Sequence, residues 1–341
     1  MENWQISETD PEELVISSRI RLARNIKNTP FPHKLDMEKS KQIVKNIENA
    51  FYTADSLKED FKTVYLWEKD ELKYHEFAEK HIISPALIEN EDKAAFIYDN
   101  DETVSIMINE EDHIRLQCIT GGFDLDECYN MANKYDDLIE ETVEYAFDEK
   151  IGYITACPTN IGTGLRASAM IHLPALTMNN GMNGILKALT QVGMTIRGLY
   201  GEGSKAEGCL YQISNQITMG ISELDVIKNL KAIINQIVNQ EYQTRDQIYS
   251  AYKYELEDKI FRSLGILKNA SLMKSGECMN LLSSVRMGVE MGIIKDVDKV
   301  KLNKLLIAIQ PASLQRELHS NLTEIERDIN RARIVKSVLL D

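Results

Sequence analysis

Arginine is scarce but regularly placed in the first 244 residues, which hold 17 lysines and only six arginines. Five of these arginines alternate with apolar residues along the chain: Arg19, Arg21, Arg115, Arg166 and Arg197. Because successive side chains of a strand point to opposite faces, each segment predicts a strand with one apolar face and one arginine face. If these strands share a sheet, the arginines converge and repel one another unless a polyanion lies between them. A guanidinium group binds phosphate at two points, so the joint pattern predicts a triphosphate nucleotide as ligand, although any one arginine alone is more typical of a solvated strand.

Carboxylates and one thiol are candidates for chemistry beside these arginines. Glu110 to Asp112 form an acidic turn next to Arg115, and Glu202 lies in the glycine-rich segment GEGSKAEG. Carboxylates next to a phosphate site suggest that they hold a cation or move a proton. Cys157 lies at the end of a predicted strand, where a thiol near arginines ionises more readily. Two plainer interpretations stay open, because acidic turns are usually only solvated and most cysteines of this kind are buried and inert.

Common nucleotide-binding fingerprints are missing from the chain. It contains neither G-x-x-x-x-G-K-[ST] nor a G-x-G-x-x-G that opens a helix after a strand. The segment GEGSKAEG at 201–208 resembles a phosphate loop, but it joins two predicted strands and lacks the following helix whose N-terminus would bind phosphate. We therefore interpret it as an active-site loop.

Composition and charge exclude several classes of protein. The net charge of −14 is uneven: residues 1–244 carry 23 Lys and Arg against 40 Asp and Glu, and residues 245–341 carry 16 against 13. Such an acidic body disfavours nucleic-acid binding and suits a cationic substrate. The five cysteines form no C-x-x-C pair, which argues against disulfides and a cysteine zinc site. No apolar run approaches membrane-spanning length and the N-terminus is acidic, so we expect a cytoplasmic protein without membrane contact.

The elements that must position these residues are strands first and helices later. Strands are expected in four short runs between 60 and 120, the last two forming a hairpin around Glu110 to Asp112, and again near 151–156, 164–173, 194–200 and 208–217. Helices are expected at 124–147, at 178–191 and from 222 to the end, with a break near Pro311. This order predicts an α+β fold with a mostly antiparallel sheet flanked by helices at 1–244 and an all-α domain at 245–341.

Four motifs in sequence order, SSRIR, NEEDHIR, CPTNIGTGLR and RGLYGEGS, resemble the catalytic domain of the phosphagen (guanidino) kinases over roughly residues 15–244. That family transfers the γ-phosphoryl group of MgATP to a guanidinium nitrogen. The resemblance implies that Glu111 and Glu202 bind the guanidinium as catalytic carboxylates and that Cys157 lies close to it as a thiolate. It implies Mg²⁺ held mainly by phosphates and water, and no metal-ligating residue. The nucleotide-binding residues that it implies are Ser17, Ser18, Arg19, Ile20, Arg21, His81, Arg115, Arg166, Ala167, Ser168, Ala169, Met170, Arg197, Gly198, Leu199, Tyr200, Gly201 and Glu202.

The acceptor is indicated by what surrounds this domain. Only 16 residues precede Ser17, whereas metabolite kinases carry about a hundred residues of helical domain there, so the guanidine site would be open enough for a protein side chain. The C-terminal part resembles that of the bacterial protein arginine kinases, a branch of the family, whose R-D-x-x-R-A motif binds phosphoarginine as an allosteric ligand. Here the motif consists of Arg327, Asp328, Arg331 and Ala332, although alone it is typical of a charged helix surface.

The resemblance therefore implies an ATP-dependent protein-arginine kinase. It also implies a role in bacterial stress response and protein quality control, in which substrates are marked for a Clp-type protease. A zinc-binding activator protein, a heat-shock repressor and a homodimer are the partners implied. Two alternatives stay open: a kinase of a free guanidino metabolite such as arginine, and a non-catalytic phosphoarginine reader.

Overall fold

A computed structural model of the chain describes residues 3–7, 13–53, 55–198 and 206–340. Within these residues the main sheet has eight strands in the order β2-β3-β4-β5-β1-β8-β10-β9, and every neighbouring pair is antiparallel. The α+β fold with a mostly antiparallel sheet is therefore confirmed. The strands are β1 (Val15–Arg24), β2 (Phe61–Tyr65), β3 (Ala95–Asp99), β4 (Val104–Ile108), β5 (Ile114–Gly121), β8 (Leu165–His172), β9 (Met194–Gly198) and β10 (Leu210–Asn215), with a separate small hairpin of β6 (Phe147–Asp148) and β7 (Gly152–Tyr153).

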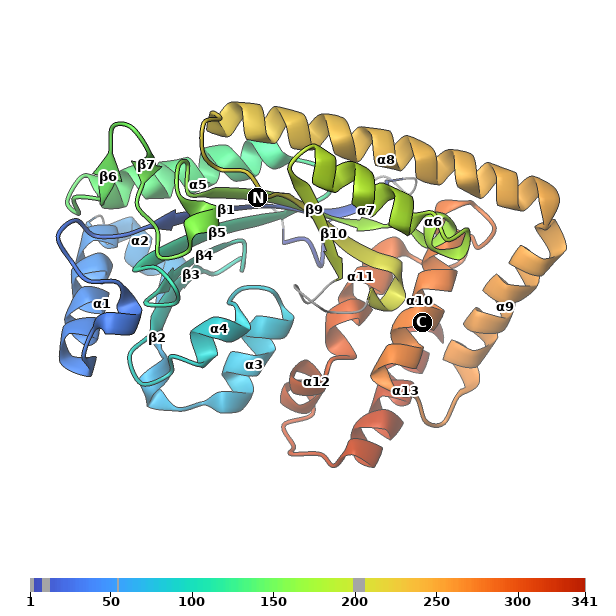
Figure 1. Cartoon of the computed structure of the whole chain (residues 1–341). Coiled ribbons are helices and arrows are strands. Elements are labelled where there is room, and N and C mark those ends of the chain that lie inside the picture. The colour runs from blue at the N-terminus through green and yellow to red at the C-terminus, as the bar shows by residue number, and fades with distance from the viewer. Residues whose placement is uncertain (1–2, 8–12, 54, 199–205, 341) are drawn as a thin grey trace.

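Helices cover the sheet unequally. Two of them, α5 (Leu125–Glu140) and the long α8 (Glu223–Ala251), run along one face (Figure 1). Both helices begin at a side-chain cap, since Asp124 accepts a hydrogen bond from the third residue of α5 and Ser222 from the third of α8. The remaining helices that precede α8 are α1 (Met37–Phe51), α2 (Asp55–Asp60), α3 (Glu71–Glu79), α4 (Pro85–Ile88), α6 (Pro174–Met178) and α7 (Met182–Gln191).

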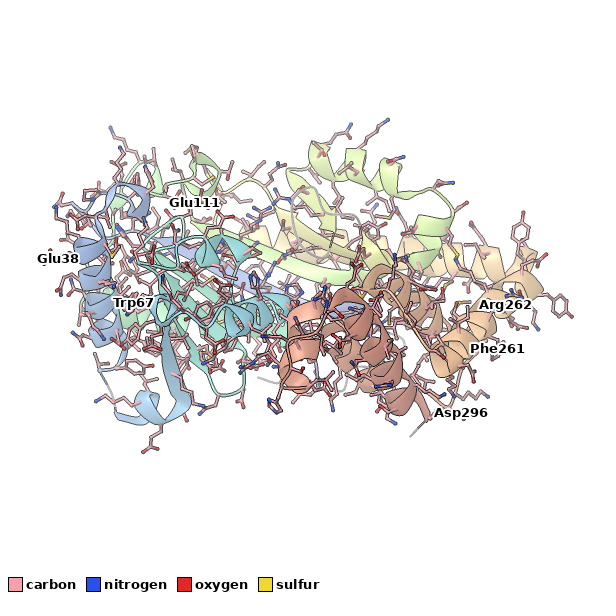
Figure 2. The ribbon with its side chains drawn as sticks, turned by 90° about the horizontal axis from the view of Figure 1, so that it is seen from below. Glu38, Trp67, Glu111, Phe261, Arg262 and Asp296 are labelled. Carbon is pink, nitrogen blue, oxygen red and sulfur yellow. The ribbon has the colours of Figure 1, made fainter. Side chains whose placement is uncertain are left out.

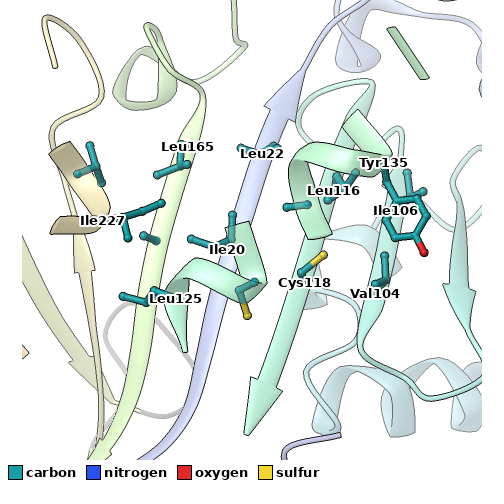
Figure 3. Close-up of a cluster of buried hydrophobic side chains, with 14 of the residues drawn as sticks. Ile20, Leu22, Val104, Ile106, Leu116, Cys118, Leu125, Tyr135, Leu165 and Ile227 are labelled. Atoms are coloured by element: carbon teal, nitrogen blue, oxygen red, sulfur yellow. The ribbon is translucent and has the colours of Figure 1, made fainter. Parts of the chain in front are cut away.

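The main core lies between the sheet and α5 and α8. Alternate residues of the central strands fill it, among them Ile20 and Leu22 of β1, which are fully buried together with Leu116 and Leu165 of the neighbouring strands (Figure 3). The same alternation sends the remaining side chains of β1, β5 and β8 to the other face, which α5 and α8 do not cover. That face carries the candidate site.

The C-terminal helices pack against the sheet-containing part of the chain through buried polar contacts. They are α9 (Lys253–Asn269), α10 (Ser275–Glu290), α11 (Lys299–Ala308), α12 (Pro311–Glu317) and α13 (Glu324–Leu340). His172, at the end of β8, pairs with Ser283 (2.8 Å) and Glu290 (3.0 Å) of α10, and Glu290 also accepts a hydrogen bond from Arg245 of α8 (2.8 Å). At another contact, Glu79 of α3 accepts the first backbone amides of α12. The two parts are joined by specific contacts that fix how they meet.

Three predicted elements differ from the structure. The helix expected at 124–147 ends at Glu140, because residues 145–146 instead pair through their backbone with residues 25–26, which directly follow β1. The helix expected at 178–191 begins only at Met182, as α7, because the chain turns at Asn180, whose φ is +56°, after the short α6. The strand expected at 151–156 keeps only two residues. The domain boundary at residue 244, which lies within α8, stays a prediction. The hairpin of β4 and β5 and the break before Pro311 are confirmed.

No helix in the described residues is both long enough and apolar enough to cross a membrane.

Candidate active site

A cavity of about 580 Å³ opens on the face of the sheet that α5 and α8 leave free. All five arginines that alternate with apolar residues line it, and three carboxylates do so as well. The convergence predicted from the strand pattern is therefore confirmed. Its charged lining residues are Arg19, Arg21, Arg115, Arg166, Arg197, Glu110, Glu111 and Asp112, and His81, Cys157 and Gln117 are among the others.

Cross-strand register brings the arginines together. Arg21 of β1 lies directly opposite Arg166 of β8, and Arg19 lies two residues along the same face. Like charges in this arrangement destabilise a sheet. Burial, with the neighbouring Arg115 and Arg166 next in importance, lowers the pKa of Arg19 to about 9. Burial, followed by the charges of Arg19, Arg115 and Arg166, lowers the pKa of Arg21 well below its usual value. The Nε atom of Arg21 is buried without a hydrogen-bond partner among the described residues. These features fit a cavity that receives a polyanion such as the phosphates of ATP.

One arginine of the cavity already has a carboxylate partner. Arg115 forms an ion pair with Glu110, which is 4% exposed and also accepts a hydrogen bond from Ser84. Burial opposes the charge of Arg115, but Glu110 raises the pKa of this arginine above its usual value. Glu110 therefore fixes Arg115, and it is Glu111 that stays available at the cavity wall.

Glu111 and Cys157 meet at one end of the cavity. Burial, followed by the charges of Asp112 and Glu110, raises the pKa of Glu111, whereas a hydrogen bond with the Cys157 thiol lowers it. Cys157 Sγ also lies 3.0 Å from Thr159 Oγ1. A carboxylate with a raised pKa next to a thiol can bind a guanidinium group and accept a proton from it.

Buried polar groups hold this end in place. Asp112 Oδ1 accepts hydrogen bonds from Asn25 Nδ2 and from the Ala156 amide, both at 2.6 Å. Asn25 in turn accepts a hydrogen bond from the backbone amide of His113 and donates one to the carbonyl of Ile154. The acidic turn and the segment before Cys157 are therefore clamped to the end of β1.

The residues predicted to bind the nucleotide fall into two groups, because alternate residues of a strand face opposite sides of the sheet. Ser17, Ser168 and Met170 line a smaller cavity beside Arg19 and His81, together with Gln212. Burial and the charge of Arg19 lower the pKa of His81 to about 3, which keeps its ring neutral. Four other predicted residues have side chains that face away from the cavity, toward the helix-covered face: Ser18, Ile20, Ala167 and Ala169. Gly198 ends β9, whereas Leu199, Tyr200, Gly201 and Glu202 lie outside the described residues.

Several functional contacts were missed by the sequence interpretation. Ser214 of β10 accepts hydrogen bonds from Arg166 at 3.2 and 3.3 Å, and Gln212 donates to Ser168 at 2.9 Å. Their alternation along β10 could have indicated them. Nothing in the pattern indicated Asn25, whose role depends on contacts with residues more than 80 positions away.

The R-D-x-x-R-A motif lies on α13, but its central groups are buried. Arg331 is 2% exposed and donates to the carbonyls of Ile309 (2.7 Å) and Met273 (2.8 Å), and it pairs with Asp328. Arg327 donates to the carbonyl of Leu322 at 3.0 Å. In this structure the motif joins helices α11 and α13, and its binding of phosphoarginine stays a prediction.

The described residues contain no group of three histidine, cysteine or acidic side chains that could hold a metal ion.

Two family descriptions match the chain. Residues 42–244 match "ATP:guanido phosphotransferase, C-terminal catalytic domain", and residues 253–341 match "Protein-arginine kinase McsB C-terminal domain". The chain is 59% identical over 340 residues to the protein-arginine kinase of Clostridium kluyveri, with 99% of both chains covered. It is 56% identical over 339 residues to that of Clostridium acetobutylicum, covering 99% of this chain and 100% of the relative. The chain belongs to the protein-arginine kinase family.

Solved structures agree with this family at the level of the fold. A crystal structure of lombricine kinase matches with a TM-score of 0.59 and 25% identity, covering 72% of this chain and 69% of its own. The duplicated taurocyamine kinase of Schistosoma mansoni, solved with bound transition-state-analogue components, matches with a TM-score of 0.59 and 23% identity. The match covers 71% of this chain and 36% of that one. By family, this protein-arginine kinase homologue is an enzyme that transfers phosphoryl groups to guanidino nitrogen.

Proposed function

We propose that this chain transfers the γ-phosphoryl group of MgATP to arginine side chains of proteins. The observation that carries the proposal is the single cavity in which five arginines converge while Glu111 and Cys157 stand together at one end. The relatives named as protein-arginine kinases support the choice of acceptor.

The residues present divide the work of such a transfer. Arg19, Arg21 and Arg166 would bind phosphate oxygens and neutralise their charge, which removes the mutual repulsion of these arginines. When bound, MgATP supplies the phosphoryl group. Glu111 would orient the acceptor guanidinium and take the proton that its nitrogen loses, and Cys157 would orient the same group. Glu202 is proposed as the second carboxylate at the guanidinium.

Acceptor competition tests this function. The protein would be incubated with γ-labelled ATP and either free arginine or an unfolded arginine-rich protein. We expect acid-labile label on the protein acceptor. Label on free arginine alone would show that the chain is a metabolite kinase, and the absence of label on both, with nucleotide bound, would show a non-catalytic reader.

A wider cellular role is part of the same proposal and rests on family resemblance. It comprises cytoplasmic stress response and protein quality control, substrates marked for a Clp-type protease, a zinc-binding activator, a heat-shock repressor, a homodimer and allosteric phosphoarginine. Co-purification of the full chain with each candidate partner tests these associations one by one.

A further inference from the structure

Besides the active-site cavity and the small one beside Arg19, a cavity of about 610 Å³ lies next to the end of the active site where Glu111 and Cys157 meet. We call that end the acceptor end and this cavity the second cavity. It is formed by the β6–β7 hairpin, residues 162–163 and residues 218–225, which lead into α8. Figure 1 shows the hairpin beside the start of α8, at one end of the sheet. Nothing in the proposed reaction uses this cavity.

Large apolar side chains stay exposed inside this cavity. Phe147 is 55% exposed, Met219 51% and Ile151 40%, although all three line a concave surface. The ring of Phe147 is held edge-on against that of Tyr153, with centroids 5.1 Å apart. Apolar groups that are ordered, exposed and gathered in a hollow are typical of a binding surface.

Only a thin ridge of backbone separates this cavity from the active site. Residues 159–160 line the active-site cavity and residues 162–163 line the second one. Thr218 donates its hydroxyl to the carbonyls of residues 159 and 161, at 2.9 and 2.7 Å. Gly162 has a φ of +114°, and a Cβ there would lie 2.2 Å from the carbonyl oxygen of Thr218. The ridge is therefore fixed, because the side-chain position of Gly162 is filled by the backbone of Thr218.

The charge of the second cavity complements a basic chain. Glu223 and Asp225 line it near the start of α8, and Lys150 is the one cation among its lining residues. The buried Arg24 lies 3.7 Å from Glu223 but pairs more closely with Asp136, at 2.7 Å. Such a surface favours a ligand with positive charge beside its apolar groups.

We propose that this cavity binds the stretch of protein substrate that flanks the acceptor arginine. The substrate class is then an extended basic segment with an apolar residue near its arginine, and such apolar residues are mostly buried until a protein unfolds. The acceptor side chain enters beside Cys157, and the neighbouring residues cross the ridge at Gly162 and place an apolar side chain against Phe147 and Met219. This inference rests on the proposed function and deepens it by naming what selects the substrate.

Peptide binding by fluorescence anisotropy tests the inference without requiring phosphoryl transfer. One labelled peptide has a central arginine flanked by leucine and lysine, and the other has serine in place of leucine. The double variant Phe147→Ala, Met219→Ala should bind the leucine peptide about tenfold more weakly and the serine peptide about equally, because only the apolar contact is lost. Phe261→Ala is the matched control, since Phe261 is 51% exposed on α9, far from Glu111 in Figure 2.

The outcomes separate the two proposals. Equal binding of the leucine peptide to the wild type and the double variant would overturn the docking surface, as would an equal loss for both peptides. Ile151→Asn provides an independent variant at the same surface and should also weaken the leucine peptide selectively. If the leucine peptide binds as expected but no phosphoarginine forms on it with MgATP, the docking surface stands and the proposed function fails.

Discussion

Asp112 offers a quantitative test of how the acceptor end is built. Its carboxylate is 2% exposed, and one oxygen accepts both the Asn25 amide group and the Ala156 backbone amide at 2.6 Å. Asp112→Ala leaves one buried donor, on Asn25, and one half-buried donor, the Ala156 amide, without an acceptor. A buried donor costs about 1–3 kcal/mol and a half-buried one less, so the free energy of unfolding should fall by about 2–4 kcal/mol. Asp112→Asn keeps an oxygen for both bonds. Because burial already raises the pKa of Asp112 and so penalises its charge, the neutral amide should cost only about 1 kcal/mol.

Asp148 provides the matched control for this measurement. It too accepts two backbone amides through one oxygen, those of Lys150 and Ile151 at 2.8 and 3.2 Å, but it lies at the surface, where water can replace them. Asp148→Ala should cost less than about 1 kcal/mol. Urea unfolding followed by circular dichroism gives all three values. Asp112→Ala should also lower kcat about a hundredfold, because a displacement of about 1 Å at a reacting group has that effect. Equal destabilisation by Asp112→Ala and Asp148→Ala would refute the reasoning.

Three further predictions concern charge. Burial, with two neighbouring carboxylates, raises the pKa of Glu111 above the ordinary value of 4.5. Because the ionised form of Glu111 is the proton acceptor, the transfer rate should fall as the pH falls through this raised pKa. A pH profile whose acidic limb is unchanged in Glu111→Gln would contradict this. Asp136 forms a buried ion pair with Arg24 at 2.7 Å, so Asp136→Ala should lower the free energy of unfolding in urea by about 3–5 kcal/mol. Glu144→Ala, at the exposed pair with Lys27, should lower it by less than about 1 kcal/mol. Equal losses of stability would show that burial is not decisive. Arg21→Met should weaken ATP binding about a hundredfold in calorimetry. The Tm of the unliganded protein should not fall, because this buried cation faces other arginines. A lower Tm would show that Arg21 supports the fold.

The sheet could be predicted from the sequence because alternation is a local signal. Arg21 and Ile20 point to opposite faces by strand geometry alone, and this was enough to anticipate both the core and the arginine cavity. The end of α5 was missed for the opposite reason. Residues after Glu140 are held by pairing with residues 25–26, and no local pattern records a partner so distant in the chain.

Within the site, charge type was predictable and partner choice was not. The acidic turn was identified beside Arg115, yet which carboxylate pairs with that arginine depends on how the turn is folded, and the structure gives this pairing to Glu110. The R-D-x-x-R-A motif shows the same limit. Alone it is typical of a charged helix surface, but Arg331 is buried and donates to the carbonyl of Ile309, just after α11, which depends on how the helices meet.

Mass spectrometry of phosphoarginine under non-acidic conditions tests the central claim most directly. A protein acceptor would be incubated with MgATP and either the wild type or Glu111→Gln, whose nucleotide binding is checked by calorimetry. We expect phosphoarginine on the acceptor with the wild type and its loss with Glu111→Gln while ATP still binds. Phosphoarginine formed equally by both proteins, or by neither, would contradict the account.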